Sequence, residues 1–135
     1  MDAFQPVAEA NFERRVMDYL RENHPEAVVE TPSGGFALTE LDEETLRRMV
    51  RAGLRAARGY GLTWESSLTS FVVVMFLVAP NFHAHPLVRR VLTDEEVEPD
   101  RRVEHLWEQT TEENWEAVQE NYDAGAWGLS APEGT

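Results

Sequence analysis

Apolar residues recur at intervals of three and four positions along most of the chain, which is the spacing of helices with one buried face. The clearest of these segments ends at a Gly-Tyr-Gly sequence at residues 59–61, and Thr39 and Asp42 are candidates for its N-terminal cap. Its apolar positions are Leu46, Met49, Val50, Gly53, Leu54 and Ala57. A similar pattern predicts a first helix over residues 7–23, which ends before Pro25 because proline disfavours a helical conformation in the residue before it.

The longest apolar stretch covers the nine residues 71–79. Because a helix needs about twenty apolar residues to cross a bilayer, this stretch indicates a buried element and no membrane span. We predict a helix over residues 64–79, capped by Thr63 or Ser66, because the segment is longer than a typical strand and no second strand-rich region could pair with it. Since the segment is apolar on all sides, we expect the other helices to enclose it.

Shorter elements precede and follow this helix. Residues 27–38 contain two apolar pieces around a Pro-Ser-Gly-Gly turn, which indicates either a loop or a short hairpin. Pro86 suits the first turn of a short helix through Leu92, and Pro99 begins a last helical region that reaches about residue 123. Thr110 and Glu113 have the spacing of a capping box, so this region is either one helix or two.

The elements predict an all-α fold in which five or six helices form a small orthogonal, bundle-like domain around the helix at 64–79. The 135 residues fit one domain, which we place at residues 1–123. Residues 124–135 are rich in glycine, proline and small side chains, and they predict a flexible tail.

Charge is distributed unevenly. The net charge is −13, yet residues 1–93 contain 12 acidic and 10 basic residues, whereas residues 94–135 contain 13 acidic and only 2 basic ones. An acidic surface repels nucleic acid and anionic lipid and attracts a basic protein. The alternative is that the acidic residues only keep the protein soluble. Five arginines cover the polar face of the helix near residue 50, and we expect them to pair with carboxylates of the last third: Arg47, Arg48, Arg51, Arg55 and Arg58.

The acidic last third contains a regular row of glutamates. They recur every fourth residue, at Glu104, Glu108, Glu112, Glu116 and Glu120. On one continuous helix each adjacent pair of like charges would be unfavourable, so either a helix break near Thr110 or a basic partner must relieve the repulsion. We therefore predict that this row binds a partner, with Trp127 in the predicted tail as an aromatic anchor. Core packing is the expected role of Trp64, Trp107 and Trp115.

No residue pattern indicates catalysis. The chain has no cysteine, which excludes disulfides and thiolate chemistry, and it has no nucleophile elbow, phosphate-binding loop or His-Glu-x-x-His motif. His83 and His85 have a spacing found in some metal sites, but they are weak candidates because no further ligands are evident. We predict no enzyme activity, no catalytic residue and no cofactor; a small metal-dependent enzyme that uses His83 or His85 is the less favoured alternative.

Several short sequences in the middle of the chain resemble a known group of proteins. They are Arg58 to Leu62, the apolar residues 71–79, Pro80 to His83, Pro86, and Val91 with Leu92. They resemble the small helical proteins encoded beside spike-tip (PAAR-type) and effector genes of type VI secretion and related contractile injection systems. The similarity covers about residues 40–107 and the stretch from Phe12 to Pro25, and this chain has His83 where an aspartate is usual.

The resemblance implies a bacterial accessory, adaptor or chaperone-like protein, and it supplies no catalytic residue. We expect a cytoplasmic protein, because the first residues show no secretory signal. Its expected partner is a secreted effector or spike component with a basic surface, bound without nucleic acid or membrane. The alternative is an immunity protein that neutralises a basic toxin. The oligomeric state does not follow from the sequence.

Overall fold

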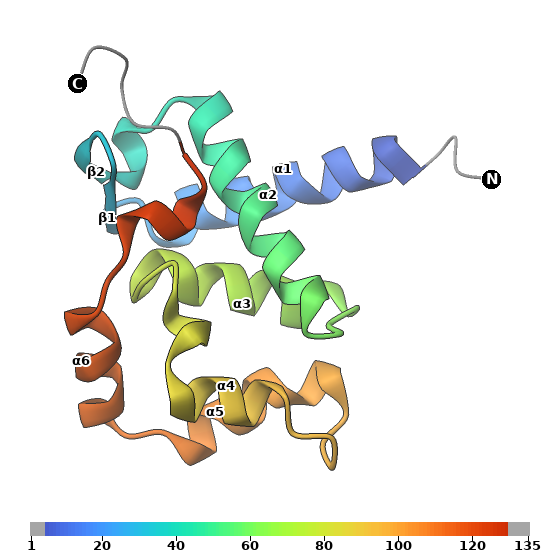
Figure 1. The fold of residues 1–135 in the computed structure, drawn as a ribbon. Helices are drawn as coiled ribbons and strands as arrows, with labels where there is room; N and C mark the ends of the chain where they lie inside the picture. The colour runs from blue at the N-terminus through green and yellow to red at the C-terminus, as the bar shows by residue number, and fades with distance from the viewer. Residues whose placement is uncertain (1–4, 130–135) are drawn as a thin grey trace.

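Helices make up most of the computed structural model, which describes the backbone of residues 5–129 and the side chains of residues 9–129 (Figure 1). The α-helices in this part of the chain are α1 (Gln5–Asn23), α2 (Glu43–Gly59), α3 (Glu65–Leu77), α4 (Pro86–Leu92), α5 (Arg102–Gln109) and α6 (Glu112–Glu120). One hairpin, β1 (Val28–Thr31) and β2 (Gly34–Ala37), follows α1. The prediction of a helical domain with five or six helices is confirmed at this level.

Single 3₁₀ turns connect the longer elements. They are η2 (Leu38–Glu40), η3 (Phe82–Ala84), η4 (Pro99–Arg101) and η5 (Ala124–Trp127). Among the residues described, no helix has both the length and the apolar character needed to span a membrane.

The apolar face predicted for α2 is the face that is buried in the structure. All six residues of the predicted apolar stripe are buried, and Asp42 caps the helix by accepting a hydrogen bond from the Thr45 backbone N–H at 3.0 Å. Gly53 allows α3 to approach closely, because a Cβ at this position would lie 3.0 Å from the side chains of Val72 and Met75. The packing of α2 against α3 therefore depends on a residue without a side chain.

The region at 27–38 is a hairpin, the second of the two predicted alternatives. Its strands pair antiparallel, with Val29 opposite Phe36. Gly34 follows the turn with a φ of 128°, a backbone conformation that favours glycine. The hydroxyl of Tyr122 accepts a hydrogen bond from the Glu30 N–H at 2.8 Å and lies 3.2 Å from the Glu30 carbonyl oxygen. The last part of the chain thus holds the hairpin in place.

Helix α3 is shorter than predicted and is capped differently. Its N-cap residue is Trp64, whose side chain makes no capping bond, so neither Thr63 nor Ser66 occupies the predicted N-cap position. The carboxylate of Asp100, which is distant in sequence, instead accepts hydrogen bonds from the Trp64 backbone N–H and the Ser67 hydroxyl. Nor is α3 enclosed on all sides, because the side chain of Leu77 is 44% exposed. The expectation of full enclosure is wrong for this face, which continues through partly exposed Val73.

The acidic last third forms two helices, α5 and α6. The break follows Thr110, and the capping box is formed by Thr111 with Asn114, one residue later than the predicted pair Thr110 and Glu113. The side chain of Thr110 instead donates a hydrogen bond to the Leu106 carbonyl oxygen at 2.7 Å. The two helices consequently point in different directions (Figure 1).

The predicted boundary between domain and tail at residue 124 is too early. Trp127 in η5 is only 1% exposed, and its ring lies 4.8 Å from that of Phe76, measured between centroids. Its indole N–H donates a hydrogen bond to the Tyr122 hydroxyl at 3.1 Å. Trp127 therefore belongs to the core, because a buried indole removes a large apolar surface from water, and η5 is part of the folded domain. Residues 130–135 of the predicted tail lie outside the described residues.

Candidate functional site

The five glutamates of the row are exposed on α5 and α6. Glu104 and Glu108 lie on α5, whereas Glu112, Glu116 and Glu120 lie on α6. Among the described residues, only Glu108 of this row has a partner within ion-pair distance, the Nδ1 atom of His105 at 3.3 Å. The break between α5 and α6 relieves part of the repulsion expected for one continuous row, but it leaves the charges without cationic neighbours.

Helix dipoles act in opposite directions on four of these five glutamates, the exception being Glu116 in the middle of α6. Glu104 and Glu112 lie in the first turns of α5 and α6, where the backbone N–H groups favour negative charge. Glu108 and Glu120 lie in the last turns, where the unpaired carbonyl groups oppose it. The fold therefore carries two carboxylates at positions that are electrostatically unfavourable for the protein by itself.

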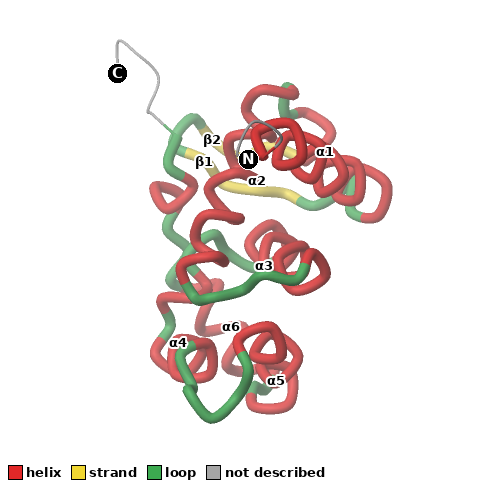
Figure 2. The backbone as a smooth tube through the Cα atoms, turned by 90° about the vertical axis from the view of Figure 1, so that its right-hand side faces the viewer, coloured by secondary structure: helices red, strands yellow, loops and turns green. Residues whose placement is uncertain are grey.

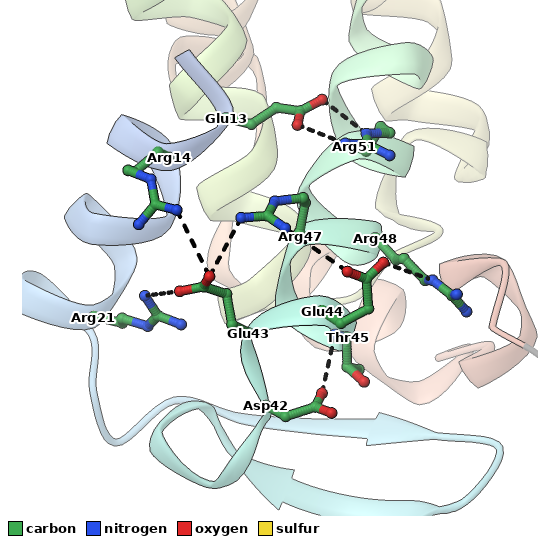
Figure 3. Close-up of polar contacts among 10 residues, drawn as sticks. All are labelled: Glu13, Arg14, Arg21, Asp42, Glu43, Glu44, Thr45, Arg47, Arg48 and Arg51. Atoms are coloured by element: carbon green, nitrogen blue, oxygen red, sulfur yellow. Dashed lines mark hydrogen bonds and ion pairs between the residues drawn. The ribbon is translucent and has the colours of Figure 1, made fainter. Parts of the chain in front are cut away.

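The arginines of α2 do not pair with the described part of the acidic last third, so that expectation is wrong for residues 94–129. Figure 3 shows the partners of Arg47, Arg48 and Arg51, which lie on α1 and on α2 itself. Arg51 donates two hydrogen bonds, each 2.9 Å long, to the buried carboxylate of Glu13, and these bonds raise the pKa of the arginine. Arg58 pairs with Glu9 in the same way.

The start of α2 has its own cluster of ion pairs. Glu43 lies within ion-pair distance of three arginines, namely Arg14, Arg21 and Arg47. Glu44 pairs with Arg47 and Arg48 (Figure 3). The arginines of the first half are thus largely neutralised by carboxylates of the same half, because these lie one helical turn away or on the adjacent helix.

The two arginines of the last third do not neutralise the glutamate row either. The guanidinium of Arg102 donates hydrogen bonds to the backbone carbonyl oxygens of Tyr60, Leu92 and Val97. Arg101 lies over the ring of Trp64, at 5.7 Å from its centroid. Within the described residues, its one ion pair is with Glu98, at 3.9 Å. Both arginines therefore serve contacts within the fold.

The tryptophans are arranged differently from the prediction. Trp127 is buried, so it is not on the surface where a recognition anchor would lie, and the prediction for this residue is wrong. Trp107, which was expected in the core, is 51% exposed, and its ring centroid lies 5.4 Å from that of Trp115. Helical spacing does not indicate this exposure, because Trp107 lies four residues after buried Val103 and so shares its side of α5.

His83 and His85 both have structural contacts. The Nδ1 atom of His83 lies 3.1 Å from the Tyr60 hydroxyl, and burial of the ring lowers the pKa of this histidine. The Nδ1 atom of His85 accepts a hydrogen bond from the Leu87 N–H and caps α4. Within the described residues, no group of three or more histidine, aspartate or glutamate side chains is placed to hold a metal ion.

Comparison of the chain with protein-family models, with curated proteins and with solved structures finds no match.

Proposed function

We propose that this protein is a non-enzymatic accessory protein that binds a partner with a basic surface through the exposed glutamates of α5 and α6. The observation that carries the proposal is the separation of charge within the fold. Glu9 and Glu13 of α1 and Glu43 and Glu44 of α2 pair with arginines around them, whereas among the described residues only Glu108 of the glutamate row has an ion-pair neighbour, His105. A basic partner would supply the missing cations.

The physical effect of such a surface is specific to charged partners. Exposed carboxylates of one sign attract a basic protein over about a Debye length, which is ~8 Å at physiological ionic strength, and they speed its association. The last-turn residues Glu108 and Glu120 should be stabilised most by a basic partner. A nearby cation would compensate the repulsion that each carboxylate experiences from neighbouring glutamates and from the free carbonyl groups at the helix end.

The setting that we propose is a bacterial secretion locus. This part of the proposal rests on the sequence resemblance to small helical proteins encoded near spike-tip and effector genes. In that setting the partner is an exported effector or spike component, and the protein acts as its adaptor or chaperone before export. The proposed site of binding is the cytoplasm.

The test is affinity purification from the encoding organism at low and high salt, with two matched variants. Glu116→Gln with Glu120→Gln removes two charges from the row, and Glu26→Gln with Glu30→Gln removes two exposed charges from the region of the hairpin. We expect a protein partner that coelutes at low salt, is lost at high salt and is recovered less with the first variant only.

Two results would contradict the proposal. One is the absence of any coeluting protein at both salt concentrations. The other is a partner that both variants retain equally and that resists salt, because such binding would not use the glutamate row. Co-expression with the partner then shows the role: an adaptor increases the partner's stability or export, whereas loss of the partner's toxicity would favour the immunity alternative.

A further inference from the structure

An apolar groove runs between α1, α3 and α5. Figure 2 shows these three helices one above another on the same side of the molecule. The groove is about 180 Å³ in volume and includes Tyr19 from α1, Val73, Leu77 and Val78 from α3 and its end, and Trp107 from α5. It follows the face of α3 that the other helices leave open.

The exposed apolar side chains of the protein concentrate in this groove. Five large apolar side chains are exposed among the described residues, and three of them line it, with exposed fractions of 44% for Tyr19, 44% for Leu77 and 51% for Trp107. An engineered cavity of about 150 Å³ accepts benzene, so a groove of this size has room for one leucine or phenylalanine side chain. Exposed apolar surface of this kind typically marks an interaction site.

The charges next to the groove indicate what occupies it. Trp107 lies on α5 between exposed Glu104 and Glu108, and it stacks on Trp115, which lies between exposed Glu112 and Glu116 on α6. The glutamate row therefore continues directly from the Trp107 side of the groove. A second copy of this chain would bring a net charge of −13 against the same surface, and like charges in contact disfavour association.

We propose that the groove binds an apolar side chain from a basic amphipathic helix of the partner, while basic residues on that helix contact the glutamates of α5 and α6. This proposal rests on the proposed function and names the form of the partner segment. An amphipathic helix presents apolar residues at i, i+3, i+4 and i+7 on one face, and arginine or lysine can flank that face. Trp107 is the central contact, because partly exposed tryptophans beside a groove commonly dominate binding energy.

The test uses two synthetic helical peptides with the same leucine, lysine and alanine content. In the first, leucines occupy i, i+3, i+4 and i+7; in the second, the same residues are reordered so that leucines surround the helix. Each peptide carries a fluorescent label, and anisotropy titrations with the full chain give its dissociation constant. We expect the first peptide to bind about tenfold more tightly than the second, with both weakened by salt.

Variants of residues in the groove test whether the groove causes the tenfold difference between the dissociation constants of the two peptides. Trp107→Ala and, independently, Leu77→Ser should abolish the preference for the first peptide while leaving the salt dependence in place. Trp64→Ala is the matched control, because Trp64 is 47% exposed but lies outside the groove, and it should retain the preference. Circular dichroism confirms that each variant folds, and two groove variants keep the test valid if one does not.

The outcomes separate the groove from the acidic surface. The proposal for the groove is wrong if both peptides bind equally, or if Trp107→Ala and Leu77→Ser keep the preference for the first peptide. Neither result would contradict the proposed function. If neither peptide binds at low salt, the acidic surface does not attract cations and the proposed function fails as well. A dimer in sedimentation that Leu77→Ser dissociates would assign the groove to a second copy and overturn the proposal.

Discussion

Asp100 binds the residues at the start of α3 although it lies far beyond the end of that helix in the sequence. Its carboxylate accepts hydrogen bonds from the backbone N–H groups of Thr63 and Trp64, both at 2.7 Å, and from the hydroxyls of Thr63 and Ser67. Burial would raise the pKa of this carboxyl, but the hydrogen bonds outweigh burial and lower the pKa from 3.8 to about 2. One side chain therefore connects η4 to the start of α3.

Replacing Asp100 by asparagine should destabilise the protein by about 1–3 kcal/mol, because an amide presents only one acceptor oxygen to four donors. Urea unfolding followed by circular dichroism measures this change. Asp94→Asn is the matched control, since among the described residues the Asp94 carboxylate accepts a hydrogen bond only from the Glu96 backbone N–H, and it should have a much smaller effect. Equal effects of the two variants would contradict the role given to Asp100.

The same residue contributes a pH dependence whose sign follows from its lowered pKa. The folded state binds a proton at Asp100 less readily than the unfolded state does. The stabilisation of the folded state by ionised Asp100 is therefore fully present above pH 3.8 and is lost as the pH falls toward about 2. The stability difference between the natural protein and Asp100→Asn should shrink over that interval.

Single residues differed in how far the sequence could predict them. Asp42 was identifiable as a cap because the helix it caps begins at the next residue. Asp100 was not, because nothing in a linear pattern indicates that η4 lies against the start of α3. Trp127 was misplaced for a similar reason: its glycine-rich surroundings indicate a tail, and only its contact with Phe76 on α3 makes it part of the core.

Helices α5 and α6 present their glutamates at opposite ends of their dipoles, and this arrangement predicts effects of opposite sign. Glu120→Gln should stabilise the fold and Glu112→Gln should destabilise it, each by roughly 0.3–1 kcal/mol at low ionic strength, because they lie in the last and first turns of α6. Thermal unfolding of the two variants at low and high salt measures the effect.

Both changes remove the same charge, so each variant is the control for the other. Added salt should reduce the difference between them. Stability changes of the same sign would show that overall charge matters more than position on the helix. If the proposed function holds, Glu120→Gln should also weaken partner binding, so that a gain in stability accompanies a loss of binding.

The elements themselves followed closely from the apolar pattern. Helix α2 and the short helix α4 were predictable because their apolar positions, caps and flanking glycine or proline agree. The division between α5 and α6 was less certain, because Thr110 and Thr111 are adjacent and both have a polar residue three positions later. The hydrogen bond from Thr110 to Leu106 decides between them in the structure.

The whole molecule is held together by contacts between its first and last parts. Trp127→Ala should cost about 3–5 kcal/mol, because it empties a buried site next to Phe76 and removes the hydrogen bond to Tyr122. Denaturant unfolding measures this cost. Trp64→Ala removes the same side chain from an exposed position and should cost about 1 kcal/mol or less, which is the value of a surface contact with Arg101. Similar costs for both would place Trp127 outside the core.

The overall charge of the chain was evident from the sequence, but its pairing was not. Arginines on α2 and glutamates of the last third have opposite signs, so pairing between them was a reasonable expectation. In the structure four of these arginines, Arg47, Arg48, Arg51 and Arg58, instead pair with glutamates on the adjacent helix or one turn away. The exposed groove at Trp107 was likewise not predictable, because it needs three helices that are distant in sequence.

The contacts made by Asp100, Tyr122 and Trp127 also affect when the protein can fold during translation. A ribosome releases the chain from its N-terminus, so α3 and the hairpin emerge before the residues that cap and cover them. We infer that α3 and the hairpin remain incompletely folded in each new molecule until Trp127 has left the ribosome. Limited proteolysis of arrested nascent chains should therefore show protection only after Trp127 has left the ribosome, and earlier protection would contradict this order.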